Sequence, residues 1–281
     1  MVIIILYWVL IINASQAPLN PKVLCLLFPV RPIFTGVTTR TTNKGNTMNT
    51  KECYTIRILA ALVCLVMPFS VLACKDPVVL VHGNTATPAS WNNTYDYLIS
   101  KGYTSADIFR PDWGAKSCAS CNNHSGSEEP PVRQALQSAL AASCTGKIDV
   151  IGHSMGATLA AQQIDKLAAA SAVDTFVGIA GAFRGLWSCG VYPFNVWSST
   201  CGSAGLSVQS PFLDGLYGAP LGAKVYSIKS YIDPIVCASG VCTVGGIHSS
   251  SIWQEDASYS YALGHFGLQT DTAAKQYDLI H

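Results

Sequence analysis

The residues with the clearest chemical potential form the segment Gly152–Gly156, which reads GHSMG and fits the pattern Gly-x-Ser-x-Gly. A sequence typical of a buried strand, residues 147–151 (KIDVI), leads directly into it, and a helical sequence starting at Met155 leads out. This setting places a serine hydroxyl on a tight turn, where the glycines let neighbouring backbone approach closely. The sequence therefore predicts Ser154 as a nucleophile at the edge of a sheet, rather than an idle serine in a glycine-rich turn.

A serine hydroxyl becomes a good nucleophile only when a base accepts its proton. With a Gly-x-Ser-x-Gly turn, the acid and then the histidine follow the serine in chain order. His265 lies between two glycines in a predicted loop before the last helix, and it is the expected base. The other histidines fit less well: His82, His124 and His153 precede the serine, His248 lies in a strand-like serine-rich stretch, and His281 is terminal.

The expected acid is Asp233, which follows the predicted strand 224–229 and precedes Pro234. An acid here would hold the imidazole of His265 in one tautomer and stabilise its charged form. Pro234 would stiffen the turn that carries the acid. Asp214 is the competing candidate, but it lies in an aromatic, glycine-rich stretch.

Attack by a serine on an acyl carbon creates a negative oxygen that needs N–H donors already in place. One expected donor is the backbone N–H of Met155, directly after the serine, at the start of a helix whose dipole favours negative charge. The other is the backbone N–H of Asn84, in the turn after the strand 77–81. His82 in the same turn is interpreted as a structural residue.

Strands and helices alternate along the part of the chain that would position these residues. This alternation predicts a three-layer α/β fold, with helices flanking a mostly parallel central sheet. In such sheets the active site lies beyond the carboxyl ends of the strands. The expected strands are 77–81, 107–109, 147–151, 174–180 and 224–229, and the expected helices are 91–101, 128–142, 155–170 and 271–280.

The composition excludes several classes of protein. Of the 281 residues, 49% are hydrophobic and 12% are charged, against about 25% charged in average soluble chains. An intrinsically disordered chain is therefore excluded. The formal net charge of +1 gives no electrostatic basis for binding nucleic acid. Eleven cysteines indicate an oxidising compartment.

The first quarter of the chain differs from the rest. Residues 1–47 are interpreted as an over-extended start or an unstructured segment, with a genuine targeting extension as the alternative. Residues 48–73 have a basic start, an apolar stretch and small residues before Cys74, which predicts a secretory signal peptide rather than a retained membrane anchor. The mature protein would be residues 74–281, a single secreted domain with 11 Lys and Arg against 15 Asp and Glu and thus a net charge of −4.

Eight cysteines lie in the mature chain. They can form four disulfides, whereas lipidation of Cys74, as in a bacterial lipoprotein, would leave an odd number. A secreted protein without a lipid anchor is therefore favoured over one anchored at Cys74. Proximity in sequence suggests the pairs Cys237–Cys242 and Cys189–Cys201. Cys118 and Cys121, with His124, could be half a zinc site, but no second half follows, so disulfides are favoured.

Four motifs together resemble the class 2 lipases of the α/β-hydrolase fold, which include small secreted bacterial triacylglycerol lipases. They are residues 77–83 (PVVLVHG), 152–156 (GHSMG), 230–235 (SYIDPI) and 264–268 (GHFGL), and the resemblance extends from Pro77 to the C-terminus. The resemblance implies hydrolysis of carboxyl esters through an acyl-enzyme, without a cofactor or metal. It implies a catalytic triad of Ser154, Asp233 and His265, and an oxyanion hole formed by Asn84 and Met155.

Residues 181–222 depart from the smallest members of that family, which lack cysteines and a lid. This stretch is long, aromatic and contains Cys189 and Cys201. It could be an acyl-binding wall or partial cap over Ser154, or a disulfide-stapled surface loop with its own small core. The substrate is therefore expected to be an ester or lipid, and the sequence does not determine the length of its acyl chain.

Two alternative functions stay open. One is an extracellular depolymerase of polyhydroxyalkanoate polyester, and the other is a non-catalytic binding protein with the α/β-hydrolase fold. A binding protein of this kind usually lacks a triad member, and all three are present. We expect a monomer with no stable protein partner and no nucleic-acid ligand.

Overall fold

The computed structural model describes residues 74–281, so the expected over-extended start (1–47) and signal peptide (48–73) lie outside the described residues. The strands of the main sheet are β1 (Val78–Val81), β2 (Ile108–Phe109), β3 (Ile148–His153), β4 (Val173–Ile179), β7 (Lys224–Lys229) and β10 (Ala257–Ser260). Their order across the sheet is β10-β7-β4-β3-β1-β2, and every neighbouring pair is parallel. None of the described helices is long and apolar enough to cross a membrane.

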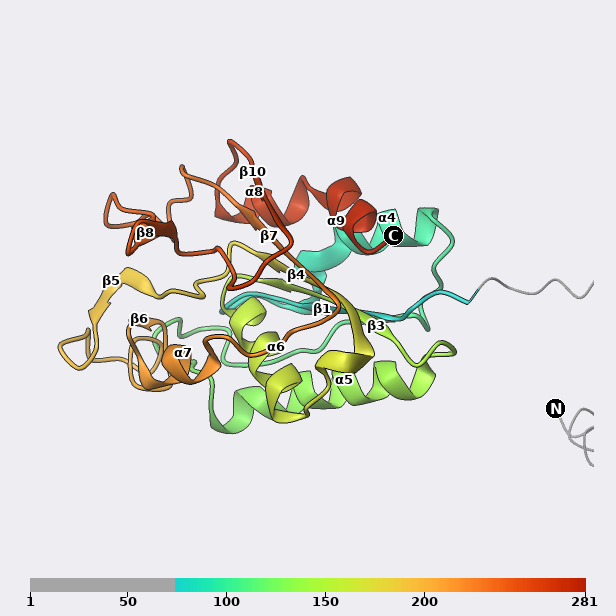
Figure 1. The fold of residues 1–281 in the computed structure, drawn as a ribbon, viewed down its shortest axis with the longest axis horizontal. Coiled ribbons are helices and arrows are strands. Elements are labelled where there is room, and N and C mark those ends of the chain that lie inside the picture. Colours follow the sequence, from blue (N-terminus) through green and yellow to red (C-terminus); the bar gives the residue numbers. More distant parts are fainter. Residues whose placement is uncertain (1–73) are drawn as a thin grey trace, which may run out of the picture. The chain divides into compact units, whose positions relative to one another are not determined.

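Helices cover both faces of this sheet (Figure 1). One face carries α5 (Glu129–Ala142) and α6 (Met155–Lys166). The other face carries α4 (Asn92–Ser100), α8 (His265–Thr270) and α9 (Ala273–Leu279). The predicted three-layer α/β architecture is therefore confirmed.

The central strands have continuous apolar runs because their side chains pack against the helices on both faces of the sheet. Along β1, Val79 and Val81 pack into the core beneath α5 and α6, while Val78 and Leu80 pack into the core beneath α4 and α9. Successive side chains of a strand point to opposite faces, so a strand covered on both sides must be apolar at every position. This requirement explains why the sequence of β1 shows no alternation with polar residues.

The predicted strands and helices are present with small shifts at their ends. The helix predicted over 155–170 ends at Lys166, just before Ala168, which has a φ of +49°. The helix predicted over 271–280 is preceded by a separate short helix, α8. His265 was expected in a loop, but it is the first residue of α8.

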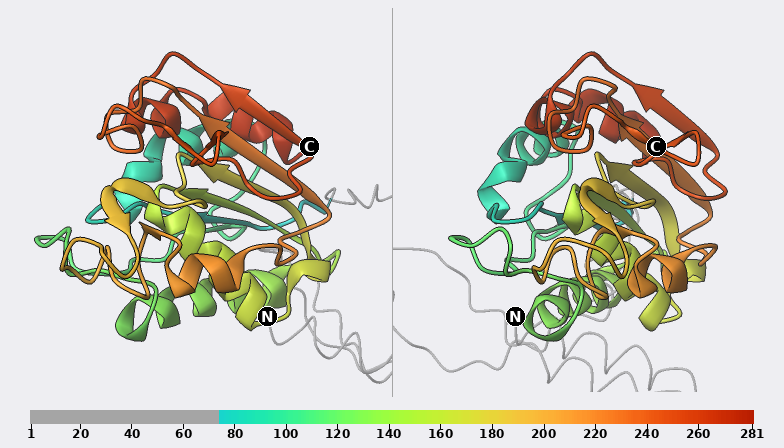
Figure 2. Two further views of the ribbon diagram at one scale, coloured as in Figure 1. Left: turned by 60° about the vertical axis from the view of Figure 1, so that its left-hand side comes forward. Right: turned by 90° about the vertical axis from the view of Figure 1, so that its left-hand side faces the viewer.

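Several short elements were not predicted. They are the 3-10 turns η1 (Pro88–Trp91), η2 (Gly126–Glu128) and η3 (Ala170–Ala172), the strands β5 (Leu186–Val191), β6 (Ser207–Val208), β8 (Thr243–Val244) and β9 (Ile247–His248), and the helix α7 (Pro211–Leu216). The segments carrying β5, β6 and β8 gather beyond the carboxyl ends of the sheet strands, at the left of Figure 1. The right-hand view of Figure 2 faces this edge.

Four disulfides link the described cysteines: Cys74–Cys144, Cys118–Cys121, Cys189–Cys201 and Cys237–Cys242. The two pairs suggested by sequence proximity are both present. Cys118 and Cys121 bond to each other, as the disulfide interpretation expected, and do not form half a zinc site. The sulfur of Cys74 is bonded to Cys144, so it is not free to carry a lipid.

Candidate active site

The site lies where the winding of the sheet reverses. The chain passes from β1 to β2 on one side and then to β3 on the other side of β1. In parallel α/β sheets, ligands bind at such a reversal, beyond the carboxyl ends of the strands. The turn after β1 carries Asn84 and the turn after β3 carries Ser154, so the two residues flank this position.

The turn at Ser154 requires the two glycines predicted for it. A Cβ atom on Gly152 would lie 2.4 Å from Cα of Ala157, and one on Gly156 would lie 2.0 Å from the carbonyl oxygen of His82. Ser154 itself has a φ of +54° and a ψ of −132°, a backbone conformation that costs a non-glycine residue about 1–3 kcal/mol. The fold therefore holds a strained serine, partly accessible to solvent, directly before α6.

Ser154, His265 and Asp233 form a continuous hydrogen-bonded chain. The distance between Nε2 of His265 and Oγ of Ser154 is 2.9 Å. On the other side of the ring, Nδ1 of His265 lies 2.7 Å from Oδ2 of Asp233. The structure thus brings together three side chains that are far apart in sequence, from the ends of β3 and β7 and the start of α8.

Asp233 is held as a carboxylate in a buried position. Its other oxygen, Oδ1, accepts hydrogen bonds from the backbone N–H groups of Ile235 (2.8 Å) and Val236 (3.0 Å). Burial favours the neutral acid, but the hydrogen bond and charge of His265 and these two N–H donors outweigh it. The net effect is a pKa of Asp233 below its ordinary value. The acid stays ionised and accepts the Nδ1–H of His265.

The turn after β1 lies directly against the serine. A Cβ atom on Gly83 would come within 3.1 Å of Cβ of Ser154. In the described part of the chain, the N–H of Asn84 donates to no backbone carbonyl. Met155 is the first residue of α6, so its N–H has no acceptor within the helix. These two N–H groups have the freedom that the predicted oxyanion hole requires.

His82 braces this turn. Its Nδ1 lies 2.8 Å from the carbonyl oxygen of Gly83, and its ring stacks on Trp113 with 5.3 Å between ring centroids. Burial lowers its pKa, so the ring is neutral near pH 7. The structure therefore agrees with the structural role expected for His82.

His153 contacts His265, and the order of the residues in the chain did not predict this contact. Its Nε2 lies 3.1 Å from the backbone carbonyl oxygen of His265, and the two rings are 4.8 Å apart. The residue precedes the serine, which excludes it as the expected base. Its position directly beside Ser154 in the turn is the one sequence signal that could have pointed to this contact.

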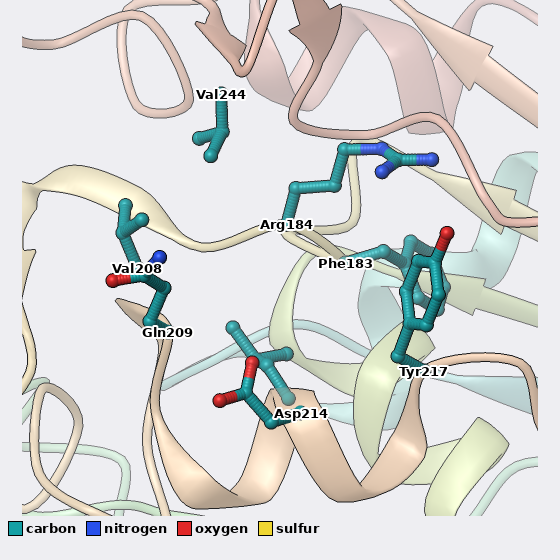
Figure 3. Close-up of a pocket in the computed structure, with 8 residues that line it drawn as sticks. Phe183, Arg184, Val208, Gln209, Asp214, Tyr217 and Val244 are labelled. Carbon is teal, nitrogen blue, oxygen red and sulfur yellow. The ribbon is translucent and has the colours of Figure 1, made fainter.

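The other candidates lie elsewhere. Asp214 is exposed and lines a pocket of about 140 Å³ that Phe183, Arg184 and Tyr217 also line (Figure 3). None of the three hydrogen-bonded residues lines this pocket. His124 bonds to Thr158 through Nε2 at 2.7 Å and stacks on Phe212, His248 bonds to Ser230, and His281 contacts Tyr277 at the terminus.

One group of potential metal ligands, Cys237, Cys242 and His248, gathers among the described residues. The two sulfurs are bonded to each other. Nε2 of His248 lies 3.1 Å from the carbonyl oxygen of Ser230, and its Nδ1 accepts the N–H of Ser250 at 3.1 Å. Because every potential ligand atom already has a partner, this group does not fit a metal ion.

The disulfide Cys189–Cys201 closes part of the long stretch 181–222, which has both buried and exposed side chains. Cys189, Cys201 and Leu206 are buried and belong to the core beneath α5 and α6. Phe194 is 92% exposed and Trp197 is 101% exposed. These two aromatic side chains are exposed to solvent.

Comparison with known proteins identifies a family that most of the chain matches. The family model described as Lipase (class 2) matches residues 75–278. The mature form of the lipase BlEst2 from Bacillus licheniformis has a TM-score of 0.53 and 12% sequence identity, covering 74% of this chain and 93% of that one. A structure of the metagenome-derived lipolytic enzymes LipS and LipT has a TM-score of 0.50 and 13% identity, covering 74% and 94%. These similarities show the α/β-hydrolase fold that the sequence predicted.

Proposed function

The chain belongs to the class 2 lipase family, and we propose that it is a secreted serine hydrolase of carboxyl esters. The observation that carries the proposal is the hydrogen-bonded chain from Ser154 through His265 to Asp233. The three hydrogen-bonded residues lie at the point where the winding of the sheet reverses, which is where parallel α/β sheets bind their ligands. Catalysis needs no cofactor in this proposal.

In the proposed mechanism, Oγ of Ser154 attacks the ester carbonyl carbon while Nε2 of His265 accepts the serine proton. Nδ1–H of His265 donates to Asp233, which fixes the tautomer in which Nε2 is free to accept that proton. The imidazolium then gives the proton to the leaving alcohol, and the acyl group stays on Ser154. Water repeats the two steps and releases the carboxylic acid.

The tetrahedral intermediate carries its negative charge on the former carbonyl oxygen. The N–H groups of Asn84 and Met155 would donate to this oxygen, and the N-terminal end of α6 adds a favourable dipole. The side chain of Asn84 fixes the backbone that carries one of these donors. It donates to the carbonyl of Ala119 at 2.8 Å and accepts from the side chain of Asn122 at 2.6 Å.

The expected setting is extracellular. Four disulfides are consistent with folding in an oxidising compartment, and residues 48–73 carry the predicted signal peptide. The expected partner is an ester or lipid substrate, and the protein is expected to act as a monomer.

The test is a chain-length series of p-nitrophenyl esters, assayed with the purified protein and its Ser154→Ala variant. We expect hydrolysis by the wild type and a loss of at least about a thousandfold in the variant. A preference for long chains would identify a lipase, and one for short chains an esterase or a polyester depolymerase. A folded wild-type protein that hydrolyses none of these esters would contradict the proposal and favour a binding protein.

A further inference from the structure

Asn122 is a buried residue whose side-chain amide groups all have hydrogen-bond partners. The residue is 1% exposed. Its Oδ1 accepts the backbone N–H of Ala115 at 2.7 Å, and its Nδ2 donates to the carbonyl of Ala115 at 2.9 Å. The second N–H of Nδ2 donates to Oδ1 of Asn84 at 2.6 Å. Leaving a buried polar group without its partner is costly, so Asn122 fixes the groups that it contacts.

The contact with Asn84 links this amide to the active site, because the backbone N–H of Asn84 is a proposed oxyanion donor. The side chain of Asn84 is held at both ends: Oδ1 accepts from Asn122, and Nδ2 donates to the carbonyl of Ala119 at 2.8 Å. The backbone here forms a turn, in which the N–H of Ala86 donates to the carbonyl of Gly83 at 3.2 Å. Anchoring the side chain therefore restricts rotation of the turn that carries the donor.

The two proposed oxyanion donors are fixed in different ways. The N–H of Met155 belongs to the first residue of α6, so the helix sets its direction. The N–H of Asn84 lies in a turn outside the strands and helices, where it donates to no backbone carbonyl of the described residues. Oxyanion donors are effective because their direction is set before the charge develops. The contact with Asn122 supplies the order that the backbone at Asn84 lacks.

The segment 115–122, here called the brace, holds Asn122 in place. The disulfide Cys118–Cys121 closes a tight turn within it. Directly before the brace, Gly114 has a φ of +71°, and a Cβ atom on it would lie 2.9 Å from Oδ1 of Asn122. Glycine is therefore required there for both its backbone conformation and the space that the amide occupies. These features fix the amide of Asn122 before any substrate binds.

A distant segment of the chain anchors the brace. Oγ1 of Thr200 lies 2.6 Å from the carbonyl oxygen of Ala119 and 2.6 Å from that of Asn122. The backbone N–H of Ser199 donates to the carbonyl of Ser120 at 3.0 Å. The brace is therefore hydrogen-bonded to two separate parts of the domain, this segment and the turn after β1.

We propose that Asn122 is a positioning residue, which holds Asn84 so that the backbone N–H of Asn84 points at the oxyanion. This inference rests on the proposed ester hydrolysis. Asn122 acts through Asn84 and is not itself a donor to the oxyanion. Loss of its contact with Asn84 should weaken stabilisation of the transition state and leave binding of the uncharged ester nearly unchanged.

The main variant is Asn122→Asp, which keeps the size of the side chain and the oxygen that accepts from Ala115. It has no N–H to donate, so an oxygen would face Oδ1 of Asn84. With dissolved p-nitrophenyl acetate, kcat is expected to fall by about 10-fold to 100-fold, because a displaced donor loses most of its effect. Acylation and deacylation both pass through an oxyanion, so KM should stay within about twofold. The affinity for phenylboronic acid, whose adduct with Ser154 is tetrahedral and negatively charged, should fall by a factor similar to that in kcat.

A double-mutant cycle separates positioning from a general loss of structure. Asn84→Ala keeps the backbone N–H and removes the side chain that Asn122 holds, so it should lower kcat about as much as Asn122→Asp does. Adding Asn122→Asp to Asn84→Ala should then lower kcat by no more than about threefold further, because the contact is already lost. A residue with only a structural role would give the same fold change in both backgrounds.

The matched control is Gln163→Glu, which also replaces a buried amide by an acid. Gln163 is fully buried, and its Nε2 donates to the side-chain oxygen of Gln162 at 2.9 Å. It lies in α6, about 13 Å along the helix from Ser154. This variant should lose thermal stability but keep kcat within about twofold of wild type. Melting curves establish that each variant is folded at the temperature of the assay.

The outcomes separate this inference from the proposed function. A folded Asn122→Asp protein with the kcat and boronic acid affinity of wild type would overturn the inference, as would equal fold changes in both backgrounds of the cycle. If Asn122→Asp does not fold, an unchanged kcat in Asn84→Ala, which breaks the same contact, would overturn it. A wild-type protein that hydrolyses no ester would refute the proposed function, while a boronic acid affinity that depends on Asn122 would still support the positioning role.

Discussion

The imidazole of His153 donates a hydrogen bond from Nε2 to the backbone carbonyl oxygen of His265, at 3.1 Å. Burial, together with the neighbouring His265, lowers the pKa of His153 to about 3, so the ring is neutral and carries one proton. The donated bond fixes that proton on Nε2, while Nδ1 is buried without a partner. The residue before the proposed nucleophile therefore holds the backbone of the proposed base.

This relationship predicts that His153 is a positioning residue. His153→Leu removes the donor and should lower kcat by about tenfold, because small misplacements of a reacting group are costly. His153→Gln keeps a side-chain N–H donor at a similar reach and should retain kcat within about threefold. Steady-state kinetics on a dissolved ester measures both, with thermal melting as the folding control. Equal losses in the two variants would contradict the positioning role.

The backbone strain at Ser154 predicts an unusual order of stabilities. Ser154→Ala and Ser154→Gly both remove the hydroxyl, but only glycine adopts a φ of +54° without steric cost. Relief of about 1–3 kcal/mol of strain should exceed the roughly 0.5–1 kcal/mol that glycine usually costs. Urea unfolding should therefore show Ser154→Gly to be at least as stable as Ser154→Ala. If the glycine variant is about 1 kcal/mol less stable, as at an ordinary position, the turn stores no strain.

The buried carboxyl group of Asp149 should make the free energy of unfolding depend on pH. Its side chain is buried in β3, where burial, with smaller effects of Asp76 and Asp174, raises its pKa to about 8. The unfolded carboxyl has a pKa of about 3.9, so between about pH 4 and pH 8 the unfolded chain has lost a proton that the folded protein keeps. The free energy of unfolding must fall as pH rises through this window.

Asp149→Asn removes this titration while keeping an oxygen that can accept the N–H of Thr175, which lies 3.1 Å from Oδ1 of Asp149. The variant should gain stability relative to wild type as pH rises, reaching about 1–3 kcal/mol near pH 8. Urea unfolding at several pH values measures the difference. Parallel curves for the two proteins across pH 4–8 would show that Asp149 ionises normally in the folded state.

The disulfides predict unequal losses of stability. Cys74 and Cys144 are separated by 70 residues, whereas Cys237 and Cys242 are separated by 5. In the chain-entropy description, replacing the first pair by serine should cost about 4 kcal/mol and replacing the second about 2 kcal/mol. Denaturant unfolding of the two double variants provides the comparison. A larger loss for the Cys237–Cys242 pair would mean that native contacts around Asp233 outweigh the entropy of the unfolded chain.

The central strands could be predicted because their burial on both faces produces apolar runs that glycine and proline interrupt. The edge strand β10 could not, because its sequence, ASYS, alternates between half-buried and exposed positions and carries no apolar run. The short strands β5 and β6 lie in a stretch where a disulfide and the main core determine the structure. Local sequence patterns do not contain those long-range contacts.

The same distinction between local sequence patterns and long-range contacts applies to the candidate site. Chain order and the motif around Ser154 pointed to His265, and to Asp233 over Asp214. The structure places His265 within hydrogen-bonding distance of both Ser154 and Asp233. The contact between His153 and His265, and the environment of Asp149, depend on atoms from distant elements that pack together only in the fold. Their roles could not be predicted from residue type and spacing.

The central claim is that Ser154 carries the acyl group during ester hydrolysis, and mass spectrometry of the digested protein tests it directly. The wild-type protein is mixed with a p-nitrophenyl ester, quenched in acid within the first turnovers and digested. The account predicts an added acyl mass on the peptide that contains Ser154, and none in Ser154→Ala. Ester hydrolysis at the wild-type rate by Ser154→Ala, or an acyl group on another residue, would contradict it.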